Sequence, residues 1–271
     1  MRLRWAVVLL LAAPSFAGVT YRSVTKIESG AGKIPTTQEM SIQAWISGGN
    51  AKTEMPGSGG VFPAGSYMLK RADNAAMLMV NPGDKSYIVW DPEKMMRRIS
   101  KALQSAYRIE DAKWEKVSEE DGGPIDGYPT EHYHYRFTYN MVITLDGKDE
   151  RAPATMDQEF WTTEKLADPG LAVTSSYGFV QELSGLSPEI EQMLRAEMSE
   201  MKGFALKQVW TIRTTTDGDQ KFEQKMTTTV SDIQVVDVPE SVFVVPAEYR
   251  EKQPPTFDLE KVSKPAQDPE L

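Results

Sequence analysis

The sequence predicts an α+β fold that is mainly antiparallel β: a partly open half β-barrel with helices covering its concave face. Two observations predict this class. Apolar and polar residues alternate with a period of two in many segments, as they do along a half-buried strand. In two other segments apolar residues recur every three or four positions, as they do on one side of a helix. No internal repeat or linker divides the chain, so we expect one domain around one core.

The N-terminus has the pattern of a secretory signal peptide. Two arginines lie among the first four residues, an apolar run from Trp5 to Ala13 follows, and a proline and a Ser-Phe-Ala sequence end the pattern at Ala17. We expect residues 1–17 to be removed after Ala17 and the mature protein to be periplasmic or secreted. The apolar run has about nine residues, far fewer than the roughly 20 of a membrane-spanning helix, so we expect no membrane span.

Composition excludes several classes of partner and chemistry. The formal net charge of −9 gives no electrostatic reason to bind nucleic acid, so we expect no nucleic-acid partner. The chain has no cysteine, which excludes disulfides, thiol nucleophiles and thiolate metal sites. An exported protein without disulfides must rest on its hydrophobic core, and 271 residues with 40% hydrophobic composition are enough to build one.

The first half of the mature chain predicts a series of strands. Alternation indicates strands over residues 19–27, 40–46, 67–70, 76–80 and 85–91. A loop rich in glycine and proline separates the second from the third, and an Asn-Pro-Gly-Asp turn precedes the last. Consecutive short strands joined by such turns favour an antiparallel sheet.

Both predicted helices begin with a capping side chain followed by proline. Asp91 precedes Pro92 and Ser187 precedes Pro188, and an apolar stripe follows each pair. The first stripe extends to about Tyr107 and the second ends before Gly203. Between the first helix and the next strand, SEEDGGPIDGYP predicts a polar loop.

The longest alternation begins at His132 and sends a row of aromatic rings to one side of a strand. Its partner is predicted over 155–163, and a later hairpin turns at Asp217-Gly218 to a returning strand with a bulge near Asp232. A second apolar row lies on the first strand of that hairpin. The two rows are the candidate lining of an apolar face: Tyr133, Tyr135, Phe137, Tyr139, Phe204, Leu206, Trp210 and Ile212.

His132 and His134 are the only histidines, spaced as two metal ligands on one strand would be. They lie on the side of Arg136, opposite the aromatic row. An arginine there would repel a divalent cation, and no third protein ligand can be identified. We therefore expect exposed imidazoles that bind no metal.

Other patterns of catalytic or cofactor sites are missing from the sequence. It has no G-x-S-x-G motif, and its glycine-rich loop lacks the G-K-[ST] ending of a phosphate-binding loop. The acidic cluster Glu119-Glu120-Asp121 fits a solvated charge run better than an acid and base pair. We expect no enzyme, no catalytic residues and no cofactor.

Four segments resemble a family of exported bacterial proteins known only as a domain of unknown function. They are DVPESVFVVPAEY (237–249), NPGDKSYIVWD (81–91), IDGYPTEHYHYRF (125–137) and FWTTEKLADPG (160–170). The family is distantly similar to the lipoprotein localisation factors, or lipoprotein carriers. The resemblance implies an unclosed β-barrel whose concave apolar side is covered by helices and accepts acyl chains. Thr130 stands where the family usually has a cysteine.

These observations give residues 18–249 as one lipoprotein-carrier-like domain and 250–271 as a disordered, proline-rich tail. Two functional hypotheses stay open. The first is a non-enzymatic protein that binds a lipid or other hydrophobic ligand in the half-barrel cavity, where methionines would adapt to an irregular apolar shape. The second is an envelope protein-protein interaction module whose core is filled by its own side chains and holds no ligand.

Overall fold

A computed structural model of the chain describes residues 18–31, 34–55, 63–74, 76–91, 94, 107–145, 148–166, 171, 192, 200–215 and 221–253. These residues form one sheet of twelve strands in the order β12-β6-β5-β4-β3-β2-β1-β11-β10-β9-β8-β7. All neighbouring pairs are antiparallel except β12 and β6, which are parallel. The sheet is open, with β7 at one edge and β12 at the other.

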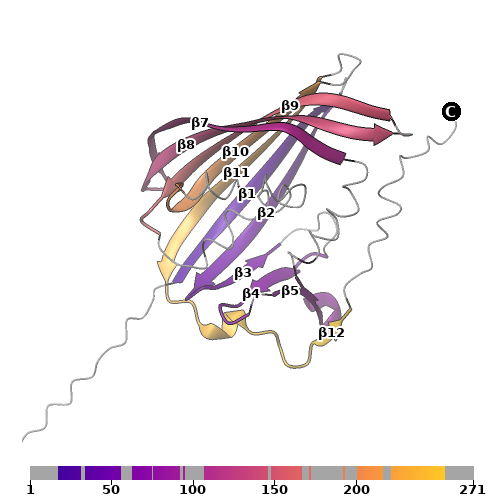
Figure 1. Cartoon of the computed structure of the whole chain (residues 1–271). Helices are drawn as coiled ribbons and strands as arrows, with labels where there is room; N and C mark the ends of the chain where they lie inside the picture. The colour runs from indigo at the N-terminus through magenta and orange to yellow at the C-terminus, as the bar shows by residue number, and fades with distance from the viewer. Residues whose placement is uncertain are drawn as a thin grey trace, which may run out of the picture.

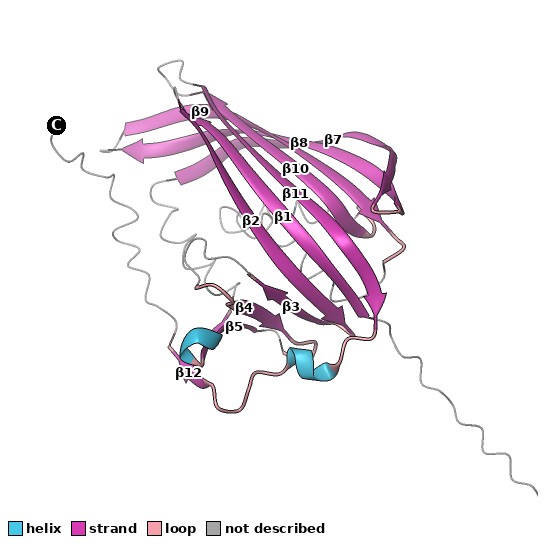
Figure 2. Cartoon of the chain, turned by 180° about the vertical axis from the view of Figure 1, so that it is seen from behind, coloured by secondary structure: helices cyan, strands magenta, loops and turns pink. Residues whose placement is uncertain are grey.

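The sheet has a large part made of long strands and a small part made of short ones. The long strands lie side by side and twist together, while the short strands lie at one end of them (Figures 1 and 2). The large part comprises β1 (Gly18–Ala31), β2 (Ile34–Ser47), β7 (Tyr107–Ile125), β8 (Tyr128–Leu145), β9 (Lys148–Thr163), β10 (Phe204–Thr215) and β11 (Lys221–Val236). The small part comprises β3 (Asn50–Glu54), β4 (Tyr67–Lys70), β5 (Met77–Asn81), β6 (Ser86–Trp90) and β12 (Arg250–Lys252).

Alternating side chains explain why the long strands have one buried side. On β8, Tyr133, Tyr135 and Phe137 are at most 2% exposed, and they point to one side because successive residues of a strand face opposite ways. Directly opposed residues of antiparallel strands share a face, so the pairing of β8 with β9 continues this side through Met156 and Phe160. The register therefore assembles one apolar surface from several strands.

Two of the segments that resemble the family meet in the small part. The Asn-Pro-Gly-Asp turn forms the 3-10 helix η1 (Pro82–Asp84), in which the Asn81 side chain accepts a hydrogen bond from the Gly83 amide at 2.9 Å. The C-terminal segment contributes η2 (Glu240–Phe243), and Phe243 is buried with Leu69 and Val80. The chain then forms β12, which pairs with β6.

The predicted α+β class, with helices covering the concave face of a half barrel, is wrong. The described elements are almost entirely antiparallel strands in an open sheet, η1 and η2 are short 3-10 helices, and no described helix covers a face. The two expected helices, at 92–107 and before Gly203, lie almost wholly outside the described residues. A capping pair and an apolar stripe indicate a local preference for helix. They do not specify which surface the stripe packs against, because tertiary packing decides that.

The prediction of a polar loop at SEEDGGPIDGYP is also wrong, because most of this segment belongs to β7. This strand has 19 residues and pairs with β8 from Tyr107 to Ile125. Its register shifts at three places, between Glu110 and Lys113, Lys116 and Ser118, and Asp121 and Gly123. Each shift interrupts the alternation by which a strand is recognised in a sequence.

The predicted signal peptide and the predicted C-terminal tail lie mostly outside the described residues. Residues 1–17, expected as a signal peptide, lie outside the described residues, and β1 begins at Gly18. The expected tail begins with the three residues of β12, and residues 254–271 lie outside the described residues. Within the described part of the chain, no helix has the length and apolar character needed to cross a membrane.

Candidate functional site

The apolar side of β7 to β10, here called the aromatic face, is aligned by strand register. One row across four strands consists of Trp114, Phe137, Met156 and Ile212, and each residue is directly opposite the next. The next row holds Tyr135, Gln158 and Trp210. Rows of this kind place large side chains about 5 Å apart across a sheet.

Burial on the aromatic face is uneven. Phe137 and Met156 are 0% and 1% exposed, whereas the large side chains around them are only partly buried. The ring of Phe137 lies 4.9 Å from that of Tyr139 and 5.8 Å from that of Trp114, between centroids. The partly buried residues of this cluster are Ile109, Ala112, Trp114, Tyr139, Trp210 and Ile212.

Two polar groups on neighbouring rings of the aromatic face are buried without a hydrogen-bond partner among the described residues: the Tyr135 hydroxyl and the Trp114 Nε1. The centroids of the two rings are 5.5 Å apart. Burial raises the pKa of Tyr135 to about 12, so its hydroxyl keeps its proton at neutral pH. The Gln158 amide, opposite Tyr135, donates to the Met156 sulfur at 3.2 Å, and a thioether is a weak acceptor.

Lys116 lies directly opposite Tyr135 and brings charges to the edge of the aromatic face. Its ammonium is hydrogen-bonded to Glu119 and lies 3.4 Å from the Glu200 carboxylate. The hydrogen bond with Glu119 is the main cause that raises the pKa of Lys116 above its ordinary value, so it stays charged. One ammonium and two carboxylates thus leave this edge with a net negative charge.

The eight residues predicted to line an apolar face do not form one cluster. Tyr133 and Tyr135 pack with Phe160, and Phe137 packs with Met156, while Tyr139, Trp210 and Ile212 are partly buried beside the latter pair. Phe204 and Leu206 belong to a separate core, where the Phe204 ring is 5.3 Å from that of Tyr21. A bulge between Ala205 and Lys207 separates the two groups, because it interrupts the alternation of β10.

The opposite side of the same strands, here called the polar face, holds both histidines. His132 lies between two carboxylates, with Nδ1 3.2 Å from Glu120 and Nε2 3.1 Å from Glu159. Its ring stacks on Trp161 with centroids 4.2 Å apart, and the Lys207 ammonium lies 4.0 Å from the centroid of the same indole. The imidazole is therefore held by neighbours on both of its edges and on one of its flat sides.

His134 belongs to a second group on the polar face, centred on Asp157. The Asp157 carboxylate accepts hydrogen bonds from Arg136 and Arg213, each at 2.8 Å, and lies 3.1 Å from His134 Nε2. Burial alone would raise the pKa of Asp157, but the hydrogen bonds from His134 and the arginines outweigh it and hold that pKa below its ordinary value. Arg213 also pairs with Glu223 at 2.8 Å.

The structure changes the expectation for the imidazoles in one respect. They do lie opposite the aromatic row, but they are not freely exposed, since the side chains of His132 and His134 are 13% and 20% exposed. The sequence could not show this, because the covering carboxylates come from the neighbouring strands. Across the described ranges, His, Asp and Glu side chains form no group of three suited to hold a metal ion.

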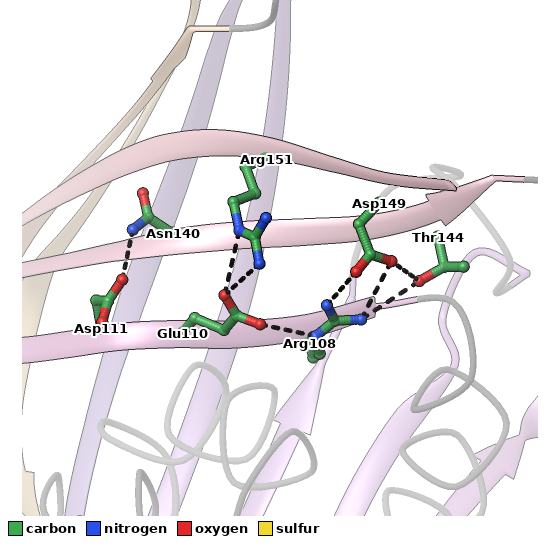
Figure 3. A network of polar contacts seen from close by, with 7 residues as sticks. All are labelled: Arg108, Glu110, Asp111, Asn140, Thr144, Asp149 and Arg151. Carbon is green, nitrogen blue, oxygen red and sulfur yellow. Dashed lines mark hydrogen bonds and ion pairs between the residues drawn. The ribbon is translucent and has the colours of Figure 1, made fainter. Parts of the chain in front are cut away.

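A third polar network covers the far end of β7, β8 and β9 (Figure 3). Arg108 bonds to Glu110 at 2.9 Å and to Asp149, and Glu110 also accepts from Arg151 at 3.3 Å. Val142 lies opposite Arg108 on one side and Arg151 on the other, and it is fully buried. The arginine stems thus shield an apolar residue on an otherwise polar face.

The small part carries an open depression of about 330 Å³. Its lining is mostly apolar and comes from β5, β6 and the C-terminal segment: Leu78, Tyr87, Val89, Val245, Pro246, Ala247, Tyr249 and Glu251. None of the polar clusters described above borders it. We therefore place the candidate site on the aromatic face, where apolar surface and buried polar atoms occur together.

Comparison with solved structures finds only remote likenesses. A DUF1329 family protein from Desulfovibrio piger is 11% identical over 85% of this chain and 91% of its own, with a TM-score of 0.28. PNGF-II is 10% identical over 90% of this chain and 32% of its own, with a TM-score of 0.34. A lipovitellin, in a structure concerned with lipid-protein interactions, is 8% identical over 82% of this chain and 26% of its own, with a TM-score of 0.29. Likeness at this level transfers no function.

Comparison of the sequence with known families is more decisive. No curated protein matches the chain. A family described as Domain of unknown function (DUF4412) matches residues 32–249, which include the strands of the aromatic face. The predicted resemblance to a family of unknown function is thereby confirmed, and the chain belongs to the DUF4412 family.

Proposed function

We propose that this chain is a non-enzymatic binding protein that holds an apolar ligand, such as an acyl chain, on the aromatic face of β7 to β10. One observation carries the proposal: large apolar side chains surround the buried pair Phe137 and Met156 but are only partly buried themselves. Complete burial of a side chain of this size contributes roughly 1.5 to 3 kcal/mol. A ligand would gain the part of this free energy that the protein has not already gained, summed over the side chains that it covers.

The difference between the two faces supports the choice of surface. The polar face satisfies its charges within the protein, through the bonds around Asp157 and His132. The aromatic face instead combines incompletely buried rings with the Tyr135 hydroxyl, which has no partner among the described residues. Apolar side chains that lie together with a few polar groups are typical of the lining of a ligand site. The signal-like N-terminus supports an exported site of action, in the periplasm or outside the cell.

The proposal is tested with the natively purified mature protein. An organic extract is examined by mass spectrometry for stoichiometric lipid, and binding of the fluorescent probe N-phenylnaphthylamine is titrated. Two variants of neighbouring residues on β10 are compared. Ile212→Gln replaces an apolar side chain on the aromatic face by an amide. Arg213→Gln introduces the same amide side chain on the polar face, in place of a charged one.

We expect lipid in the extract, and we expect Ile212→Gln to weaken probe binding several-fold while Arg213→Gln binds as the unsubstituted protein does. Circular dichroism and thermal unfolding show whether both variants stay folded. Absence of lipid together with absence of probe binding would rule the proposal out. Equal weakening by both variants would place the probe elsewhere.

A second candidate function is a protein-protein interaction at the edge strand β7. This strand has 19 residues and, among the described strands, pairs only with β8, so its outer edge can accept an added strand. Its three register shifts restrict such pairing to short stretches. Val117 is 41% exposed on this strand, and Val117→Lys should abolish co-purification of a stoichiometric partner without changing probe binding. If this variant still retained the partner, the edge of β7 would be excluded as the site of partner binding.

A further inference from the structure

Within the proposed ligand site, we infer that the ligand presents a neutral oxygen acceptor, such as an ester or amide carbonyl, to Trp114 and Tyr135. This inference rests on the proposed function and adds the chemistry of the ligand's polar end. It follows from three features of the described residues: which polar atoms lack partners, what those atoms can do chemically, and which charges lie beside them.

The first feature is the pair of atoms without partners. The Tyr135 hydroxyl and the Trp114 Nε1 are both buried and have no hydrogen-bond partner among the described residues. Tyr135 is 0% exposed, and its ring neighbours that of Trp114 at 5.5 Å. Roughly nine in ten or more of the buried polar groups in native proteins are bonded, so two exceptions on neighbouring rings require an explanation. A bound molecule that accepts from both atoms would supply the missing partner.

The second feature is the chemistry of these atoms. An indole N–H can only donate a hydrogen bond, so the partner that Trp114 lacks must be an acceptor. A tyrosine hydroxyl is protonated at pH 7 in any case, and burial raises the pKa of Tyr135 further, to about 12, so the hydroxyl can donate to the same oxygen. The nearby Gln158 amide donates to the Met156 sulfur, a weak acceptor that an oxygen would replace favourably. The indole N–H, the hydroxyl and the amide are all hydrogen-bond donors, so an oxygen acceptor is the partner that fits them.

The third feature is the charge beside the pair. Lys116 lies opposite Tyr135, but its ammonium is already bound by Glu119 and lies 3.4 Å from Glu200. A carboxylate or phosphate ligand would meet two carboxylates and one ammonium, so its charge would be repelled. A neutral carbonyl avoids this repulsion and still accepts both hydrogen bonds. The charges thus favour an esterified or amide-linked acyl chain over a free fatty acid.

The test compares three molecules with the same chain length: methyl decanoate, decanoate and decane. Each competes with N-phenylnaphthylamine for the mature protein at pH 7. We expect methyl decanoate to displace the probe at a concentration roughly 25-fold lower than decane, as two neutral hydrogen bonds imply, and decanoate to be weaker than the ester. The ester's advantage over decane should fall about fivefold in Tyr135→Phe, the equivalent of one neutral hydrogen bond. Trp114→Phe should reduce it similarly.

Tyr128→Phe is the matched control, because it removes a hydroxyl from a tyrosine of the same strand that packs against the separate core of Tyr21 and Phe204, outside the proposed site. This variant should keep the ester's advantage. If decanoate is the best competitor, or if the advantage survives both Tyr135→Phe and Trp114→Phe, the inference is wrong while apolar binding itself stands. If no probe binds and none of the three competes, the proposed function fails as well.

A second measurement does not depend on any ligand. Because the Tyr135 hydroxyl has no partner among the described residues, Tyr135→Phe should leave the thermal unfolding midpoint of ligand-free protein unchanged or raise it. A clear fall in that midpoint would show that the hydroxyl is bonded within the protein. That outcome would overturn the inference even if the variant bound the ester more weakly.

Discussion

The two faces of β8 and β9 differ in whether their polar atoms have bonding partners within the described residues. On the polar face, Asp157 bonds to Arg136 and Arg213, and His132 lies between two carboxylates. On the aromatic face, the Tyr135 hydroxyl has no described partner although its side chain is fully buried. Buried polar groups are costly when unpaired, so the first face is complete by itself and the second is not. The difference points to the aromatic face as the place where something else binds.

The largest expected effect comes from deleting a ring on the aromatic face. Phe137 is 0% exposed and contacts the rings of Trp114 and Tyr139, so Phe137→Ala should lower the free energy of unfolding by about 3–5 kcal/mol. Urea denaturation measures the change. Thr138→Ala, on the polar face of the same strand, serves as the control and should change it by less than about 1 kcal/mol. If both variants lost a similar amount of unfolding free energy, the two faces would not differ in their contribution to stability.

A smaller loss is expected from the centre of the polar face. Asp157→Asn removes the charge that binds Arg136 and Arg213, and the Asp157 side chain is only 13% exposed. We expect the free energy of unfolding to fall by about 1.5–3 kcal/mol, the range for hydrogen bonds to a charged group. Urea denaturation at pH 7 measures it, with the more exposed Glu223→Gln as control. An unchanged stability would mean that this network is not needed to hold the sheet.

Acidification should reveal the same carboxylate by its pKa. Hydrogen bonds hold the pKa of Asp157 below its ordinary value, so the unfolded chain takes up a proton more readily than the folded one. The stabilisation is present above the unfolded pKa of about 3.9 and is lost as the pH falls further. The stability gap between the unsubstituted protein and Asp157→Asn should therefore narrow below about pH 4. A gap that widened there would contradict this assignment.

The smallest effect is expected at the surface network over Val142. The Arg108 side chain is 43% exposed, and exposed ion pairs are screened by salt. Arg108→Gln should shift the thermal midpoint less than Phe137→Ala or Asp157→Asn does, and the shift should disappear at about 1 M salt. Val142→Ala, beneath the same network, should have a larger effect that salt does not remove. A large salt-resistant effect of Arg108→Gln would show that the arginine stem shields the valine more than expected.

Sequence reasoning was most successful where alternation was long and uninterrupted. The segment from His132 onwards has rings on one side and imidazoles on the other, and β8 has this arrangement. It failed for β7, because three register shifts and a run of acidic and glycine residues conceal the period of two. Pairing with β8 makes that segment a strand, and no local pattern records such pairing.

The candidate site was predictable only in part. Tyr135 was among the residues expected on an apolar face, but Trp114, Lys116 and Gln158 were not, because each is a single residue without a motif. Trp114 lies on β7, which alternation did not reveal as a strand, and its position opposite Phe137 follows only from the register of β7 and β8. The helical cover expected for the face was wrong, since an apolar stripe does not specify its packing partner.

The sequence by itself determined which side chains share a side of each strand, because the pleat alternates with every residue whatever the strand's neighbours. It also determined membership of the family, through residues 32–249. The tertiary structure alone decided the strand order, the open edges at β7 and β12, and the lack of a described partner for the Tyr135 hydroxyl. These features depend on contacts between residues far apart in the chain, such as β1 with β11, and no local pattern encodes such pairings.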